Sequence, residues 1–371
     1  MSLKVLELFG GIGACTQALK RLDIDFQVDF QVVDYVEIDK YAVASYNAIN
    51  ETNFEPQDIC NWNKNIETDL IMHGSPCQDF SVAGKQAGGD IGSGTRSSLM
   101  YETIRIVGKL RPKYVLWENV KNLLSKKHKH NFDSYIETMN VLGYNSYYQV
   151  LDAKDYGIPQ HRERVYTISI RKDIDKGDFK FPEKEELKLK LKDLLEDKVD
   201  EKYYLSDKMI TYMTGINQKE SKFPRGERFL SNINRKEQDI ANSITTNAGQ
   251  RPTDNFIINK KQQLCDYLIE NNKVKENDVI RHSYSTSRMK EWQKRNIENN
   301  NIVPTLDTRS DCLGVVTKTS LNGLRIRKLT PKECWRLMGF DDKSFLKAQK
   351  VNSNAQLYKQ ARKFNRCRCF I

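Results

Sequence analysis

The sequence predicts an α/β fold: a doubly wound, mainly parallel sheet, followed by a second, smaller and irregular domain. Three observations predict it. Short apolar runs alternate with amphipathic segments of helical period, which is the pattern of strands joined by crossover helices. The first apolar run ends in a cluster of glycines. Near residue 172 the periodicity gives way to a stretch rich in Lys, Glu and Asp and then, from residue 203, to polar sequence rich in Asn, Ser, Thr and Arg.

The elements of the expected sheet follow one another up to residue 171. Short apolar runs predict buried strands, and longer amphipathic segments predict helices. The expected strands are Val5–Phe9, Val32–Val36, Leu70–His73, Tyr114–Trp117, Tyr144–Leu151 and Arg164–Ile170. The expected helices are Cys15–Leu22, Tyr101–Leu110 and, late in the chain, Thr330–Gly339. In the polar region, Ser243–Ile257 and Pro304–Val316 look alike and are expected to hold paired strands of one module.

Composition narrows the class of protein. The chain has 371 residues and a formal net charge of +11, and such a basic excess favours a polyanionic partner, of which nucleic acid is the commonest. Its eight cysteines form no CxxC pair, which argues against a zinc site and, at this length, against a disulfide scaffold. We therefore expect no metal and a reducing cytoplasm. The sequence shows no signal peptide and no apolar run long enough to span a membrane.

A glycine loop and two acids form the first candidate site. The loop Phe9–Gly13 closes a strand and opens a helix, where glycines let a ligand approach the backbone. Thr16 occupies the last glycine position of the dinucleotide fingerprint, which argues against a phosphate-binding site. Glu37 can accept hydrogen bonds from two ribose hydroxyls, and Asp58 can accept one from an adenine amino group. Each acid alone is more often a surface carboxylate, but together they predict an adenosine-shaped site.

Cys77 lies in the loop Gly74–Ser81, which follows a strand. This loop is the local sequence pattern that most strongly indicates a catalytic site. A lone cysteine is usually a small core hydrophobe, whereas one in a polar loop at a strand end is more often a nucleophile. Glu118 leaves another strand, and we expect it at the same edge. The two arginines of Gln160–Arg164 occupy alternate positions and can hold a phosphate or a base oxygen. For the acid and the arginines a structural ion pair is an equally good interpretation, and His161 is given no catalytic role.

In order and spacing these segments resemble the motifs of the cytosine-C5 DNA methyltransferases, which include the type II modification methylases of bacteria and phages. The resemblance covers residues 1–171 and 324–361. It includes Arg96–Leu99, similar to the helix start after the nucleophile loop, and Arg327–Phe340, similar to a late motif that organises the recognition domain. The family implies a Rossmann-like fold, S-adenosylmethionine as cofactor and double-stranded DNA as partner.

The resemblance implies a role for each candidate residue. Those implied to be catalytic are Cys77, Glu118, Arg162 and Arg164. Those implied to bind the cofactor are Phe9, Gly11, Gly13, Glu37, Ile38, Asp58 and Pro76. Those implied to hold the substrate are Gln78, Ser81, Asn119 and Gln160.

The implied reaction methylates C5 of a flipped-out cytosine in a specific DNA sequence. Addition of the Cys77 thiolate at C6 makes the ring nucleophilic at C5, and Glu118 stabilises this intermediate through N3. The base must leave the stacked duplex to be reached. The family further implies that residues 1–172 form the catalytic domain, that 173–325 choose the target, and that 326–371 return to the catalytic domain.

Other interpretations stay open. A tRNA cytosine-C5 methyltransferase shares the fold and the nucleophile, but has a shorter recognition region than the roughly 150 residues between Arg171 and Arg327. A methylase of small-molecule pyrimidines is a less favoured interpretation, because it needs no large basic recognition module. A DNA-binding remnant with impaired catalysis is the alternative outside the enzymes. A cognate restriction endonuclease is a functional partner to be tested, and we expect a monomer.

The C-terminal stretch departs from the family. Tyr358–Ala361 begins the final motif, which in the family continues Gly-Asn-Ser and an apolar helix that closes the cofactor pocket. Here Arg362–Ile371 follows, with four basic residues and no acid. The codons GCA-AGG-AAA-TTC can encode Ala361–Phe364, and deleting one A after GCA would restore Gly-Asn-Ser. We hypothesise a one-base insertion, which predicts an uncovered apolar face and weak cofactor binding.

Overall fold

The computed structural model describes residues 2–77, 79–80, 88–90, 92–206, 256–259 and 325–363. Its contacts divide the chain into two compact units. One contains Met1–Leu194 and Pro331–Ile371, and the other takes most of the residues between Leu195 and Thr330. All the candidate residues that the structure describes lie in the first unit.

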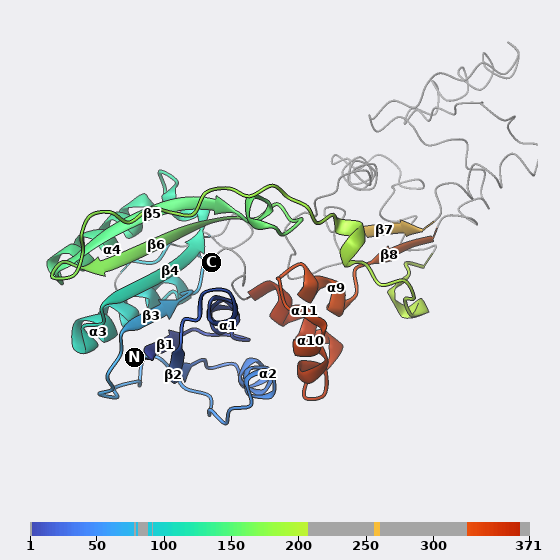
Figure 1. Ribbon diagram of the computed structural model, residues 1–371, viewed down its shortest axis with the longest axis horizontal. Coiled ribbons are helices and arrows are strands. Elements are labelled where there is room, and N and C mark those ends of the chain that lie inside the picture. Colours follow the sequence, from blue (N-terminus) through green and yellow to red (C-terminus); the bar gives the residue numbers. More distant parts are fainter. Residues whose placement is uncertain are drawn as a thin grey trace, which may run out of the picture. The chain divides into compact units, whose positions relative to one another are not determined.

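Six strands form one sheet in the first unit, in the order β2-β1-β3-β4-β6-β5 (Figure 1). Their bounds are β1 Leu3–Leu8, β2 Phe30–Val36, β3 Leu70–His73, β4 Tyr114–Val120, β5 Tyr144–Asp152 and β6 Glu163–Arg171. The first four pair in parallel, whereas β6 runs antiparallel to both of its neighbours. Its direction follows from the short connection Ala153–Arg162, which leaves no room for the crossover helix that a parallel return needs. The predicted mainly parallel sheet is confirmed.

Helices cover both faces of the sheet, which makes it doubly wound (Figure 1). The helices are α1 Ala14–Phe26, α2 Lys40–Asn50, α3 Met100–Leu110 and α4 Lys129–Val141. Neighbouring residues of β1 enter different cores: Val5 packs with Leu19 of α1, and Leu6 belongs to the cluster of α3 and α4. This alternation is what a strand buried on both faces requires. Among the described helices, none combines the length and apolar character needed to cross a lipid bilayer.

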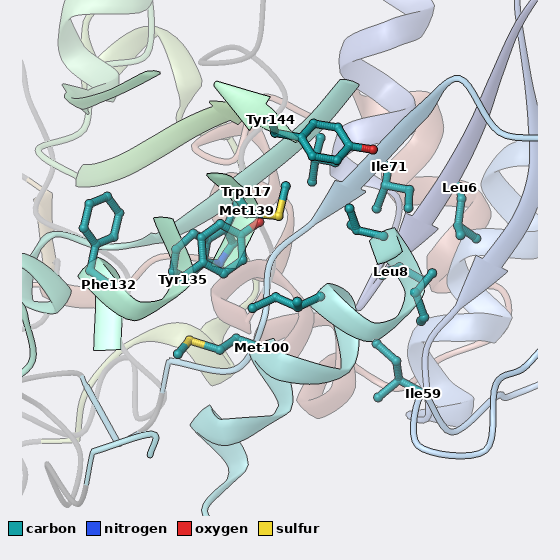
Figure 2. Packing of buried hydrophobic residues seen from close by; sticks show 14 of the residues in the cluster. Leu6, Leu8, Ile59, Ile71, Met100, Trp117, Phe132, Tyr135, Met139 and Tyr144 are labelled. Atoms are coloured by element: carbon teal, nitrogen blue, oxygen red, sulfur yellow. The ribbon is translucent and has the colours of Figure 1, made fainter. Parts of the chain in front are cut away.

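The larger core lies between the sheet and the helices α3 and α4 (Figure 2). The ring of Trp117 lies 4.0 Å from that of Tyr135 and 5.9 Å from that of Phe132, centroid to centroid. His73 stacks on Trp117 at 5.7 Å, and burial lowers the pKa of His73 to about 3, so its ring is neutral. These contacts fix the ends of β3 and β4, from which the nucleophile loop and the acid emerge.

Three late helices return to the first unit: α9 Pro331–Arg336, α10 Asp342–Gln349 and α11 Asn354–Lys363. The helix expected at Thr330–Gly339 is therefore present but shorter. Lys347 of α10 donates to the Ile49 carbonyl of α2, and Gln360 of α11 accepts a hydrogen bond of 3.0 Å from the Ser45 hydroxyl. Helix α11 runs two residues past Ala361.

The remaining elements are short. Five 3-10 turns are described: Arg96–Leu99, Lys121–Leu124, Ala153–Tyr156, Leu191–Leu194 and Glu201–Tyr203. In the second unit β7 (Phe256–Asn259) pairs antiparallel with β8 (Arg325–Lys328). The first of the two similar polar segments thus reaches into a strand, but its partner is β8. The second, Pro304–Val316, lies outside the described residues.

Candidate active site

The glycine loop at the end of β1 turns on left-handed residues. Positive φ angles occur at Phe9, Gly11 and Gly13, with values of 53°, 57° and 82°. A Cβ on Gly10 would lie 2.6 Å from the ring of Tyr35, and one on Gly13 would lie 2.7 Å from the ring of Tyr46. The Tyr35 hydroxyl also donates to the Gly11 carbonyl. Both glycines are therefore required where the loop backbone rests on the two aromatic rings.

Glu37 is held at the end of β2 by backbone amides. Its Oε1 accepts a hydrogen bond of 2.8 Å from the Asp39 amide, and its Oε2 accepts one of 3.3 Å from the Gly11 amide. The carboxylate is 9% exposed. It therefore ties the ends of β1 and β2 together, at the edge where a nucleoside would meet the sheet.

The other residues expected to contact the cofactor surround Glu37. Ile38 is 61% exposed, an apolar side chain open to solvent beside a carboxylate. The Gln57 amide donates to the Glu37 carbonyl at 2.9 Å, which brings the exposed Asp58 to the same corner. Ile38 thus lies between the acids Glu37 and Asp58, next to a backbone that glycines leave accessible. This arrangement fits an adenosine, whose ring faces are apolar and whose edges are polar.

The nucleophile loop is fixed to β4 through Ser75. Its hydroxyl accepts hydrogen bonds from Nε1 of Trp117 at 3.0 Å and from Nδ2 of Asn119 at 3.3 Å. Two residues later Cys77 is half-buried, and its carbonyl accepts a hydrogen bond of 3.1 Å from the Phe80 amide. Asn119 thus holds the loop in this structure, while its expected substrate contact stays a prediction.

Glu118 faces the two expected arginines. It is 5% exposed, and its Oε1 lies 3.0 Å from Nε of Arg164. Burial raises the pKa of Glu118, and the charges of Arg164 and Arg162 oppose the rise. The same arginines act on Cys77: burial raises the pKa of the thiol, Arg164 and Arg162 lower it, and Glu118 raises it further. The four residues therefore form one electrostatic group, in which the thiol is the favoured form of Cys77.

Asp152 organises the segment that carries the arginines. Its Oδ1 accepts a hydrogen bond of 2.8 Å from the Arg162 amide, and its Oδ2 pairs with Nδ1 of His161 at 2.5 Å. Gln160 is fully buried, and within the described residues neither atom of its amide group has a hydrogen-bond partner. His161 is thus paired with Asp152, and its having no catalytic role stays a prediction.

Sequence reasoning placed most of this site but not its supports. It expected Cys77, Glu118 and the two arginines, and the structure brings these four side chains together. Pro76 is half-buried beside the nucleophile, whereas Gln78 and Ser81 lie outside the described residues. The supports Ser75, Trp117 and Asp152 were missed, because each acts through a partner distant in sequence or through a backbone amide, which no local pattern reveals.

Comparisons with known proteins follow the same motifs. The family described as C-5 cytosine-specific DNA methylase matches residues 3–361, so the match ends where the departing C-terminal stretch begins. The chain is 30% identical over 427 residues to the orphan methyltransferase M.SPRI of Bacillus phage SPR, covering 96% of this chain and 93% of that protein. It is 37% identical over 217 residues to the type II methyltransferase M.HhaI of Haemophilus parahaemolyticus, covering 57% and 62%.

Solved structures agree on the fold. A DNMT2 mutant of Spodoptera frugiperda is similar with a TM-score of 0.62 at 18% identity, over 99% of this chain and 97% of that one. The methyltransferase EhMeth of Entamoeba histolytica is similar with a TM-score of 0.63 at 16% identity, over 99% and 95%.

Proposed function

The chain belongs to the C-5 cytosine-specific DNA methylase family and methylates C5 of cytosine with S-adenosylmethionine, and we propose that its target is a specific sequence of double-stranded DNA and that Cys77 forms a covalent intermediate with the base. The observation that carries the proposal is the group formed by Cys77, Glu118, Arg162 and Arg164. A nucleophile, a buried acid and two cations at one strand edge are what addition to a pyrimidine ring needs.

The cofactor supplies an activated methyl group. In the proposed site Glu37 holds the ribose hydroxyls, since its carboxylate already lies at the end of β2. Ile38 would pack against the adenine and Asp58 would accept from its amino group. Phe9, Gly11, Gly13 and Pro76 would hold the rest of the cofactor.

The chain's own residues carry the cytosine through the reaction. The Cys77 thiol gives up its proton to water and its sulfur bonds to C6. The electron pair of the C5–C6 double bond then forms a C4–C5 double bond, and the electron pair of the C4–N3 double bond moves to N3. Glu118, whose pKa burial raises, donates a hydrogen bond or its proton to N3 and so neutralises the developing charge. C5 takes up the methyl group that the cofactor would supply, with S-adenosylhomocysteine as the leaving group. Water then takes the C5 proton, the electron pair of that C–H bond restores the C5–C6 double bond as the sulfur leaves C6 as a thiolate, and Glu118 recovers the proton it gave to N3.

The neighbouring polar groups orient the base. Arg164 lies beside Glu118 and, with Arg162, can hold a base oxygen or a phosphate. Gln160, with its buried amide, is proposed to contact the substrate, as are Gln78, Ser81 and Asn119. Transferring residues 173–325 into a relative should move the methylated sequence with them, which tests their role as the target-recognition domain.

Double-stranded DNA is proposed over tRNA because roughly 150 residues separate the two motif blocks, which leaves room for a module that reads base edges in a groove. The net charge of +11 suits either nucleic acid. A monomer suffices for this chemistry, and a cognate restriction endonuclease would act on the same sequence and need not bind this chain.

Transfer of tritiated methyl groups to duplex DNA and to tRNA, followed by bisulfite sequencing of the duplex, tests the proposal. Duplex DNA should be labelled and Cys77→Ser should abolish labelling, while DNA binding persists because phosphate contacts supply most of the affinity. Duplex DNA that contains 5-fluorocytosine should trap the wild-type protein covalently, since the fluorine cannot leave as a proton does. The matched control is Cys60→Ser, because Cys60 is exposed. Labelling of tRNA alone, or an active Cys77→Ser protein, would contradict the proposal.

The same assay decides whether the protein is an impaired remnant. Titration with S-adenosylmethionine measures cofactor affinity directly, independently of turnover. DNA binding without measurable cofactor binding would support the remnant.

A further inference from the structure

Glu7 is a buried acid that the reaction does not use. It occupies β1 between Leu6 and Leu8 and is 1% exposed. In the sheet it pairs with Tyr35 of β2 and Met72 of β3. A carboxyl group at such a position costs free energy when it is charged, unless the surroundings compensate.

The surroundings of Glu7 compensate with neutral donors. The hydroxyl of Thr16 in α1 donates to Oε2 of Glu7, and the hydroxyl of Tyr46 in α2 lies 3.0 Å from that of Thr16. Oε1 of Glu7 is buried and has no hydrogen-bond partner within the described residues. Burial raises the pKa of Glu7 to about 7, and hydrogen bonds from Thr16 and Cys15 reduce the rise. The acid therefore titrates near neutral pH.

The stem of Glu7 lies directly beneath the glycine loop. A Cβ on Gly10 would come within 2.9 Å of Cγ of Glu7. Tyr35 touches the same glycine and donates to the Gly11 carbonyl. One face of the loop is therefore packed on Glu7 and Tyr35, and the cofactor is proposed to lie against the loop.

The cofactor changes charge when it reacts. S-adenosylmethionine carries a permanent positive charge on its sulfonium, and the product S-adenosylhomocysteine has a neutral thioether in the same place. A buried negative charge attracts the first and not the second, and the attraction is strong where water is excluded.

We propose that Glu7 is a specificity-determining residue that, when ionised, makes the site prefer S-adenosylmethionine over S-adenosylhomocysteine. The inference rests on the proposed position of the cofactor on the loop Phe9–Gly13. Ionised Glu7 limits product inhibition, because it favours exchange of the neutral product for the cationic substrate. Protonated Glu7 leaves the two ligands undistinguished by charge.

The groups that face Glu7 come from three elements. They are Tyr35 on β2, Tyr46 on α2, and Cys15 and Thr16 on α1. Burial raises the pKa of both tyrosines well above 10, so they stay neutral. Glu37 and Asp39 also act on Tyr35.

Calorimetric titration of the full-length protein with each ligand separately, without DNA, tests the inference. The ratio of the S-adenosylhomocysteine Kd to the S-adenosylmethionine Kd should rise about fivefold from about pH 5.5 to about pH 8.5. In Glu7→Gln the ratio should be independent of pH. In Thr16→Val the rise should move to higher pH, because the variant loses a donor that favours the carboxylate. Glu137→Gln, an exposed change on α4, should behave as the wild type.

The results distinguish a failure of the role proposed for Glu7 from a failure of the proposed cofactor site. A pH-independent ratio in the wild type overturns the role of Glu7 while the proposed cofactor site stands, and this measurement does not require that any variant folds. A rise that persists in a folded Glu7→Gln protein also overturns it. Absence of binding by either ligand overturns the proposed cofactor site and this inference with it.

Discussion

The two halves of the strand edge bury a carboxyl group in different ways. In the cofactor half, built on β1 and β2, Glu7 is hydrogen-bonded by a neutral hydroxyl. In the nucleophile half, built on β3, β4 and β6, Glu118 lies 3.0 Å from Arg164 and also feels Arg162. Burial raises the pKa of both acids. The arginines place Glu118 in an electrostatic group with the nucleophile, where it can exchange a proton with the substrate. Within the described part of the chain Glu7 has only neutral partners, so its ionisation can respond to the charge of a ligand bound on the loop above it.

The halves also differ in which parts of the chain build them. The hydrogen bonds and the ion pair that hold the nucleophile loop, Glu118 and the arginines come from residues between Ser75 and Arg164. The cofactor half also uses the end of the chain: Nζ of Lys359 lies 3.0 Å from the carboxylate of Asp39, and Gln360 donates to the Tyr41 carbonyl at 2.9 Å. A change after Ala361 should therefore reach the cofactor half first.

The largest expected effect distinguishes the two acids by their chemistry. Glu118→Gln should lower the single-turnover rate of methyl transfer by about 10³-fold, because it removes the group that can give N3 a proton. DNA affinity should change far less. Glu7→Gln, measured at saturating cofactor in the same rapid-quench assay, should keep a rate near that of the wild type. Unchanged single-turnover kinetics in Glu118→Gln would show that the acid has another role.

The second effect distinguishes them by stability. The pKa of Glu7 is raised from 4.5 to about 7, so the folded state holds the proton more tightly than the unfolded state does. Protonated Glu7 therefore contributes fully to the free energy of unfolding below about pH 4.5, and this contribution is lost as the pH rises to about 7. The contribution amounts to roughly 3 kcal/mol. Chemical denaturation should show the wild type losing this much relative to Glu7→Gln as the pH rises. Parallel stability curves for the two proteins would contradict the prediction.

The sequence predicted the sheet because its strands are apolar runs, but it could not give the direction of β6, which depends on a connection and not on a pattern. Helices α2 and α4 were missed. In α4 the buried residues Phe132, Tyr135 and Met139 are separated by polar positions, and such a stripe is weak in a single sequence. The contacts that position the site were out of reach for a different reason.

The candidate site shows where local reasoning ends. Cys77 and Glu118 could be proposed because each follows a strand within a recognisable motif. Glu7 carried a signal as well, since an acid in an apolar strand is unusual, but its pKa depends on Thr16 and Tyr46 in two separate helices. The pKa of Glu7 thus depends on how the two helices pack against the strand. No local sequence pattern reveals such packing.

A third and smaller effect concerns the C-terminal stretch. Replacing Arg362–Phe370 with the reconstructed ending Gly-Asn-Ser-Ile-Val-Val-Asp-Val-Leu should stabilise the fold, because each buried aliphatic side chain contributes roughly 1.5–3 kcal/mol. It should also strengthen S-adenosylmethionine binding by about tenfold, because the restored Asn loop and helix would close the cofactor pocket. Alkylation of Cys77 should stay the same, since the nucleophile half does not use this segment. The gene sequence is an independent check: a CGN codon for Arg362 would exclude the one-base insertion. Equal cofactor affinity for the two endings would show that the tail is harmless.

The smallest effect reports the balance of charge around the nucleophile. Because Glu118 raises the pKa of Cys77 and Arg164 lowers it, Glu118→Gln should move the pH profile of Cys77 alkylation to lower pH and Arg164→Gln should move it to higher pH. At neutral pH each change should alter the rate by about threefold in its own direction. Mass spectrometry of the Cys77 peptide after iodoacetamide treatment measures the rate, and the exposed Cys60 in the same sample serves as the internal reference. The prediction concerns the pH at which the alkylation rate of Cys77 reaches half of its maximum. The maximum rate itself is not a test, because removing either side chain also widens access to the sulfur. Displacement of both profiles in the same direction would mean that access, and not the opposed charges of Glu118 and Arg164, governs the thiol.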